Sequence, residues 1–253
     1  EILSGLVGSE MCIRDRLDGE DYILNGTKNW VTNGISCDYV IVFALTQKEV
    51  GHKGISCFIV DKSSNGFSTG KPEEKLGIRS SDTCELYFDN VRIPKQNLIG
   101  EEGDGFKIAL STLDGGRIGI ASQALGIAQA SLDASIEYSK ERVQFNKPIS
   151  LNQGIQFKLA DMAMEIEASR LLIYKAGLAK DEGKDYSHIA SMAKVYSSEV
   201  AMRSSTQCVQ IHGGYGYIKE TGVERLMRDA KITQIYEGTS EIQRVVIARE
   251  LLK

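Results

Sequence analysis

The chain has 253 residues, of which 42% are hydrophobic and 25% charged, with a formal net charge of −4. This composition is typical of a globular protein that can bury a large core in one or two domains. The acidic balance argues against a general nucleic-acid binder. No apolar run is long enough to span a membrane, so we expect neither nucleic acid nor a membrane as a partner.

The first 16 residues show no clear periodicity. They are not typical of a signal peptide, because the basic residues follow the apolar part. The run VGSEMCIRDR resembles a translated sequencing adapter joined to a partial gene. We therefore interpret residues 1–16 as a possible artefact that lies outside the folded domains.

Residues 17–102 contain short runs rich in β-branched and aromatic residues, separated by turn sequences such as NGI and SSNG. The runs are DYILNGTKNWVT, DYVIVFAL, GISCFIVD and CELYFDNVRI. This spacing predicts a small antiparallel β domain, either a barrel or a sandwich.

Residues 103–253 change to helical periodicity. We predict helices over residues 105–145, 153–183, 188–211 and 240–252, with Gly213 and Gly214 ending the third. Ser240 and Gln243 have the spacing of a capping box for the last helix. The predicted fold class is α+β: a β domain over residues 17–102, then an up-down four-helix bundle over residues 103–253.

Glu237 stands on the predicted loop just before the last helix, between a tyrosine and Gly238. Taken alone, such a residue is most simply a solvated loop acid. The five cysteines are scattered and odd in number, and the three histidines are dispersed, so we expect no disulfide framework and no metal site.

Seven segments together resemble the acyl-CoA dehydrogenase family, most closely its short-chain, butyryl-CoA branch. In chain order they are LNGTKNWVTNG, KGISCFIVDK, EEKLGIRSSDTCELYFDNVRIP, STLDGGR, ERVQFNKPI, QIHGGYGY and MRDAKITQIYEGTSEIQR, and the resemblance covers roughly residues 17–253. The resemblance implies an FAD-dependent oxidoreductase of fatty acid β-oxidation. It also implies a homotetramer that passes electrons to electron-transferring flavoprotein, in the cytoplasm of a bacterium or in the mitochondrial matrix of a eukaryote.

The resemblance implies that Glu237 is the catalytic base. It would remove the α proton of an acyl-CoA thioester while the β hydrogen leaves as hydride to flavin N5, giving the trans-2-enoyl-CoA. A carboxylate can do this if burial raises its pKa and the enolate oxygen is stabilised. The backbone N–H of Glu237 is the expected donor to that oxygen.

The other implied sites are weaker, because each also has a purely structural interpretation as a strand residue, a helix cap or a surface charge. Residues expected at the FAD of the same subunit are Trp30, Val31, Thr32, Thr239, Ser240 and Glu241. Residues expected at the FAD of a neighbouring subunit are Arg142, Gln144, Phe145, Asn152, Gln153, Gln210, Ile211, His212, Gly213 and Gly214. Residues expected at the substrate are Asp114, Arg117, Gly238 and Arg249.

Gly115 and Gly116 help to identify the branch of the family that the chain resembles. In isovaleryl- and long-chain-type members the base stands on this helix at one of these positions, so two glycines argue against those branches. An acyl-CoA oxidase, another branched-chain dehydrogenase and an inactive helical interaction module remain alternatives. The family's N-terminal helical domain and its T-E-x-x-A-G-S strand are not in this sequence, so we expect the chain by itself to bind FAD weakly.

Overall fold

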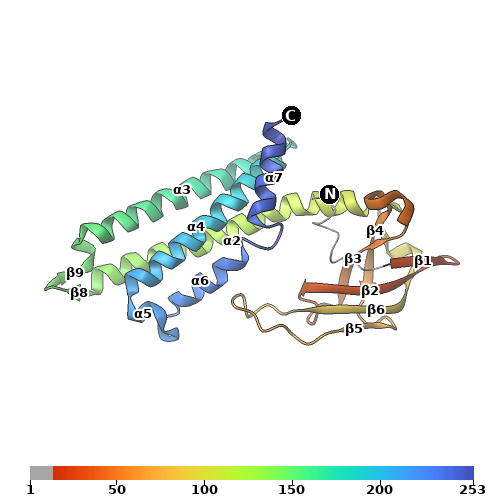
Figure 1. Cartoon of the computed structure of the whole chain (residues 1–253), viewed down its shortest axis with the longest axis horizontal. Coiled ribbons are helices and arrows are strands. Elements are labelled where there is room, and N and C mark those ends of the chain that lie inside the picture. The colour runs from red at the N-terminus through yellow and green to blue at the C-terminus, as the bar shows by residue number, and fades with distance from the viewer. Residues whose placement is uncertain (1–13) are drawn as a thin grey trace. The chain divides into compact units, whose positions relative to one another are not determined.

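A computed structural model describes residues 14–253, which form two compact units, one of strands and one of helices (Figure 1). The first unit comprises the chain up to Lys75 together with Arg79–Thr112. The second comprises Leu76–Ile78 and Leu113–Lys253. Residues 1–16 were predicted to lie outside the folded domains, which is wrong for residues 14–16, because they belong to a paired strand of the sheet; residues 1–13 lie outside the described residues.

The first unit is a seven-stranded sheet with the strand order β5-β6-β2-β1-β3-β4-β7. Neighbouring strands are antiparallel, except that β1 and β3 are parallel. This parallel pair was not predicted, because β1 begins at Arg14, inside the segment without periodicity. The strands are β1 (Arg14–Asp18), β2 (Asp21–Thr32), β3 (Tyr39–Leu45), β4 (Ile55–Asp61), β5 (Phe67–Thr69), β6 (Thr83–Pro94) and β7 (Leu98–Ile99).

Buried and exposed side chains alternate along strands of this sheet. In β3, Val40, Val42 and Ala44 are buried, whereas the alternating residues Tyr39 and Ile41 are exposed. This is the period of two that a strand with one buried face requires. The four predicted runs correspond to β2, β3, β4 and β6, while β5 and β7 are too short to leave a pattern in the sequence.

The second unit contains the helices and one short ribbon. Helices α2, α3 and α4 run side by side, and α6 and α7 both contact α4 (Figure 1). The helices are α2 (Gly105–Glu141), α3 (Gln153–Asp181), α4 (Ser187–His212), α5 (Gly214–Tyr217), α6 (Val223–Ile232) and α7 (Ser240–Leu251), and the ribbon is β8 (Val143–Gln144) with β9 (Lys147–Pro148). The predicted helical bundle following a β domain is confirmed.

Small residues form much of the helical core. Ala124 and Ala128 of α2 pack with Met162 of α3 and with Val200 and Ala201 of α4. Short side chains at these contacts let the helix axes approach closely. Within residues 14–253, no helix is both long and apolar enough to cross a membrane.

The helical unit differs from the prediction in one boundary by four residues and in an additional helix. Helix α2 ends at Glu141 rather than residue 145, because the chain turns back through Phe145 and Asn146, whose φ values are 52° and 62°. Left-handed backbone of this kind cannot continue a right-handed helix. Helix α6 was not predicted at all, although it packs against α4 through Ala230.

Candidate active site

The loop between α6 and α7 carries Glu237 in an unusual conformation. Glu237 has φ 54° and Gly238 has φ 89°, so two successive residues are left-handed. Glycine accepts this freely, but for glutamate it is a strained conformation that costs about 1–3 kcal/mol and persists only where the surroundings impose it. The backbone of Glu237 is therefore held in place by its neighbours.

Three hydrogen bonds from side chains hold this loop. The Gln243 side-chain amide donates to the carbonyl oxygens of Glu237 at 3.1 Å and of Gly238 at 3.0 Å. The Lys194 ammonium on α4 also donates to the Gly238 oxygen, at 2.5 Å. Two successive carbonyl groups thus point toward buried donors on α4 and α7, which fixes the peptide planes that follow Glu237 and Gly238.

The predicted capping box of the last helix is wrong. Thr239 is the N-cap residue, with ψ 162°, and its hydroxyl accepts from the N–H of Ile242 at 3.4 Å. The hydroxyl of Ser240 is buried without a hydrogen-bond partner. Gln243 does not reach back to a free N–H: its NH2 group donates to the loop carbonyls, and its side-chain oxygen has no hydrogen-bond partner. Helix α7 nevertheless begins at Ser240, as predicted.

The carboxylate of Glu237 lies against α2 at Gly116. A Cβ atom built at Gly116 would stand 2.5 Å from Oε2 of Glu237, closer than atoms normally approach. A glycine at this position therefore leaves room for the carboxylate. The neighbouring Tyr236 is fixed to the same helix, because its hydroxyl bonds to the side-chain oxygen of Gln123.

Two cations lie near this carboxylate. Burial raises the pKa of Glu237 above its ordinary value, and the charges of Arg117 and Lys194 oppose that rise. The pKa of Lys194 is lowered to about 8, mainly by burial. The charge of Arg117 also lowers this pKa, whereas the charges of Glu237 and Glu241 raise it. The site therefore holds a half-buried carboxyl group whose proton affinity is increased by burial and limited by two positive charges.

Arg117 has its own acidic partner. Its guanidinium lies 2.6 Å from Asp114, which also accepts a hydrogen bond from the Ser187 hydroxyl at 2.8 Å. The guanidinium is almost completely buried between α2 and α4. Asp114, Arg117, Glu237 and Gly238 thus lie in one cluster, whereas Arg249 is an exposed residue of α7.

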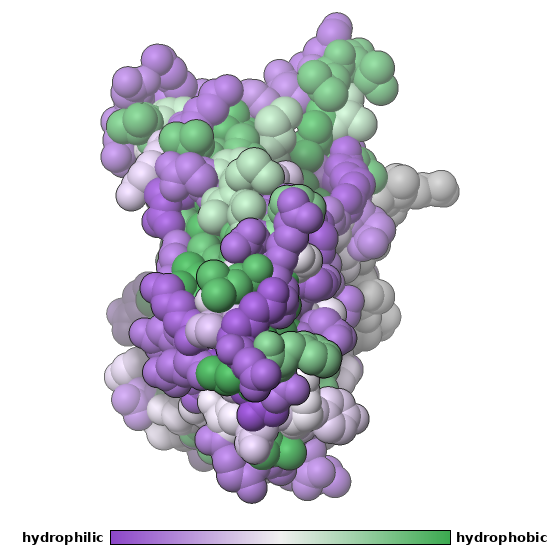
Figure 2. Space-filling view, turned by 90° about the vertical axis from the view of Figure 1, so that its left-hand side faces the viewer, coloured by the Kyte–Doolittle hydropathy of each residue, from purple (hydrophilic) through white to green (hydrophobic). Residues whose placement is uncertain are grey.

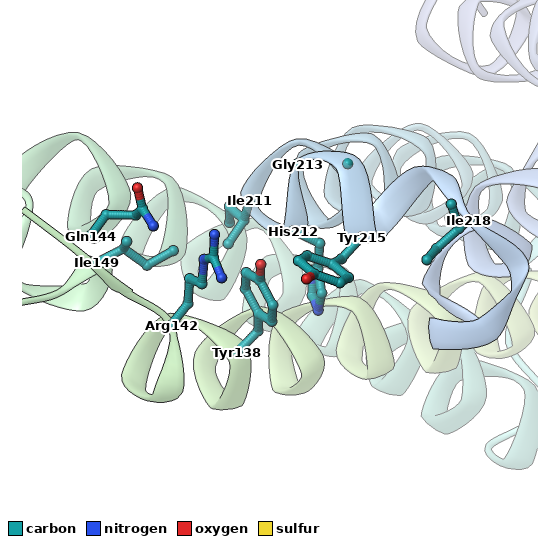
Figure 3. Close-up of a pocket in the computed structure, with 10 residues that line it drawn as sticks. Tyr138, Arg142, Gln144, Ile149, Ile211, His212, Gly213, Tyr215 and Ile218 are labelled. Atoms are coloured by element: carbon teal, nitrogen blue, oxygen red, sulfur yellow. The ribbon is translucent and has the colours of Figure 1, made fainter.

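Several residues predicted at a neighbour's FAD line a separate pocket of about 470 Å³ in the helical unit (Figure 3). The guanidinium of Arg142 lies over the ring of Tyr215, with its central carbon 5.7 Å from the ring centroid. His212 stacks on Tyr138 at 4.2 Å between centroids and bonds through Nδ1 to the Cys208 carbonyl oxygen. The predicted residues that line the pocket are Arg142, Gln144, Ile211, His212, Gly213 and Gly214.

The other predicted residues of this group lie outside the lining of the pocket. Phe145 is 89% exposed at the ribbon, Gln210 is exposed on α4, and Asn152 and Gln153 stand at the start of α3. Figure 2 faces the end of the helical unit that carries the ribbon and α5, and shows apolar patches among hydrophilic ones. Exposed apolar residues of these segments are Val143, Phe145, Tyr215, Tyr217 and Ile218.

Trp30, Val31 and Thr32 belong to the first unit, at the end of β2. The pairing of β2 with β6 shifts register between Lys28 and Val31, and Trp30 has φ 59° with 65% of its surface exposed. A bulge of this kind turns a side chain out of the regular alternation. Trp30 therefore combines a strained backbone with a side chain that is open to solvent.

Lys194 is the main residue of the site that the sequence did not predict. It lies on the buried part of α4 among Ala193, Val195 and Ser197. The sequence feature that could have identified Lys194 is a lysine among small and apolar residues of a helix, because lysine is seldom fully buried unless it is paired. Gln243 was identified only as a capping residue, and its role at the loop required the structure.

Comparison with known proteins agrees with this architecture. The family model for the acyl-CoA dehydrogenase middle domain matches residues 4–91, and that for the acyl-CoA dehydrogenase C-terminal domain matches residues 103–252. The β unit and the helical unit thus correspond to two consecutive domains of a flavoprotein dehydrogenase. The chain belongs to the acyl-CoA dehydrogenase family, as the sequence motifs predicted.

The similar proteins are longer than this chain. The short-chain specific acyl-CoA dehydrogenase of Megasphaera elsdenii is 54% identical over 96% of this chain and 64% of its own length. The solved butyryl-CoA dehydrogenase of the same organism gives a TM-score of 0.94 at 54% identity, with the same two coverages. A chain of the solved structure described as the electron transferring flavoprotein of Acidaminococcus fermentans gives 0.95 at 53% identity, again over 96% and 64%. This chain therefore spans less than two thirds of each.

Proposed function

We propose that the protein to which this chain belongs is an FAD-dependent short-chain acyl-CoA dehydrogenase with Glu237 as its catalytic base. The observation that carries the proposal is the half-buried Glu237 carboxylate. Its pKa is raised by burial, its loop is held by Lys194 and Gln243, and Gly116 leaves space for it. A base for a weakly acidic α proton needs a raised pKa together with a fixed position.

Glu237 would accept the α proton at its side-chain oxygen and become a neutral acid in a site that already favours the protonated form. Arg117 and Lys194 limit this preference, so that the resting carboxyl group can still ionise and act as a base. The N–H of Glu237 remains the proposed donor to the thioester oxygen. Gly238, without a side chain, is proposed to leave room for the acyl group.

The pocket around Arg142 has the chemistry of a nucleotide site. It combines a cationic guanidinium, the Gln144 amide and the aromatic rings of Tyr138 and Tyr215, which suit a diphosphate and a flat ring. These side chains fit the FAD of a neighbouring subunit, and Arg142, Gln144 and His212 would contact it there; the FAD of this chain's own site is proposed to lie near Glu237. Bound FAD supplies the acceptor for the hydride.

Further cofactor contacts are proposed from the family alone. Thr239 is the N-cap of α7, and Ser240 and Glu241 are its first residues; all three are proposed to lie near polar groups of the FAD. Trp30, Val31 and Thr32 are proposed to lie beside the flavin ring. The proposed partners are acyl-CoA, electron-transferring flavoprotein and further copies of the same subunit. The flavoprotein is supported by the similar chain found in a solved structure described as an electron transferring flavoprotein.

The experiment is substitution of Glu237→Gln in the FAD-loaded protein. Glutamine keeps the shape but cannot accept the proton, so flavin reduction by butyryl-CoA should slow by about 10²–10⁴-fold, with FAD content unchanged. Anaerobic stopped-flow absorbance measures the rate. The matched control is Glu220→Gln, an exposed acid in the helical unit, which should reduce its flavin at the wild-type rate. An undiminished rate in Glu237→Gln would remove Glu237 from the mechanism.

A further inference from the structure

Lys194 is a charged side chain with no exposed surface, in contact with the loop that carries Glu237. Its relative exposure is 0%, and its ammonium donates to the carbonyl oxygen of Gly238 at 2.5 Å. Placing an ammonium group in the interior is unfavourable unless nearby groups compensate for the lost water. A lysine retained in such a position therefore has its charge or its hydrogen bond used by its surroundings.

The hydrogen bond acts on strained backbone. Gly238 follows Glu237, whose φ of 54° is unfavourable for a residue with a side chain. Gln243 fixes the carbonyl groups of both residues from α7, and Lys194 fixes the second one from α4. Donors from two helices converge on the same carbonyl oxygen, so the loop is held from both sides.

The charges that face Lys194 come from three elements. Arg117 of α2 is cationic but is paired with Asp114 at 2.6 Å, which neutralises much of its charge. Glu237 of the loop and Glu241 of α7 are the acids that interact with the ammonium. Glu241 is exposed and therefore screened by solvent, whereas Glu237 is half-buried. The ammonium thus acts mainly on Glu237.

We propose that Lys194 is a positioning residue for Glu237: it anchors the strained loop through the Gly238 carbonyl, and its charge favours the ionised carboxylate that accepts the proton. This inference rests on the proposed function, because it assigns Lys194 a role in preparing the base. Lys194 does not itself touch the reacting atoms.

The first test is a ¹³C NMR titration of the Glu237 carboxyl carbon in the chain itself, with the resonance assigned by its loss in Glu237→Gln. Lys194→Met keeps the length of the side chain but removes its charge and donor. The pKa of Glu237 should then rise by about one unit, a tenfold change in the ionisation constant. The matched control is Lys180→Met, an exposed lysine whose ammonium lies near Gly115 of α2. It should leave the pKa of Glu237 unchanged.

A second measurement needs no substitution at Lys194, in case Lys194→Met does not fold. In the wild-type chain, the Glu237 carboxyl resonance should show a second, smaller inflection near pH 8, where Lys194 loses its proton. The inflection should persist in Lys180→Met. A folded Lys194→Met protein with an unchanged Glu237 pKa, or a wild-type titration without the second inflection, would overturn the proposal.

The kinetic readout separates this inference from the proposed function. In FAD-loaded Lys194→Met, the acidic limb of the pH profile of kcat/KM should move up by the same amount as the NMR pKa, which a merely structural defect would not cause. If Glu237→Gln reduces its flavin at the wild-type rate, the proposed function fails. The NMR titration still measures the coupling of Lys194 to Glu237 in that case.

Discussion

At the scale of single residues, Gly116 and Glu237 are complementary. The glycine lies on α2, where any side chain would meet the carboxylate: a Cβ would stand 2.5 Å from Oε2. The atom it would meet is the end of a flexible side chain, so a substitution would move the carboxylate and leave the helices packed. A position 121 residues away in the sequence thereby determines where the proposed base can lie.

Gly116→Ala tests this complementarity. The added methyl group should turn the Glu237 carboxylate away and slow flavin reduction by about 10²-fold, because misplacement of a reacting group by about 1 Å is that costly. The midpoint of thermal unfolding should change little, since the better helix propensity of alanine offsets the displacement. Stopped-flow absorbance and calorimetry measure the two effects.

The matched control is Gly119→Ala, on the same helix, where a Cβ meets nothing within 4 Å. It should keep the wild-type rate and stabilise the fold by about 0.5–1 kcal/mol. Equal rates for Gly116→Ala and the wild type would show that the carboxylate does not need this space.

At the scale of elements, the start of α7 organises the site. The helix is capped by Thr239, and its first turn contributes Gln243, whose side chain holds the preceding loop. The cap and the loop contacts are made by different residues. They can therefore be separated by substitution.

Thr239→Ala should lower the free energy of unfolding by about 1 kcal/mol, because one N–H of the first turn loses its acceptor. Ser240→Ala is the matched control. Its buried hydroxyl has no hydrogen-bond partner, so its removal should be neutral or slightly stabilising. Chemical denaturation of both variants measures the difference. If Ser240→Ala were the more destabilising of the two, Ser240 and not Thr239 would be the N-cap residue of α7.

At the scale of the whole molecule, α3 carries an exposed apolar stripe. The stripe consists of Phe157, Met164, Leu171, Tyr174 and Leu178, each more than half exposed and spaced by seven, seven, three and four residues. These spacings place the side chains on one face of a helix. An exposed apolar stripe of this kind suits association with another helix, which supports the proposed homo-oligomer.

Leu171→Glu should reduce the molar mass measured by light scattering, because a buried, unpaired carboxylate disfavours the contact between subunits. The matched control is Ile41→Glu, which introduces the same charge at a similarly exposed apolar residue of the β unit, and should leave the mass unchanged. An oligomer that persists in Leu171→Glu would show that the stripe is covered in some other way.

Periodicity and local motifs were enough to identify the family, the order of the two units, four strands, four helices and the candidate base, because neighbouring residues specify these features together. The roles of Lys194 and Gln243 in holding the Glu237 loop, the space that Gly116 leaves for the carboxylate and the cap at Thr239 rather than Ser240 became visible only in the folded chain. These contacts join residues distant in sequence, or depend on backbone angles that packing imposes. No local pattern encodes them.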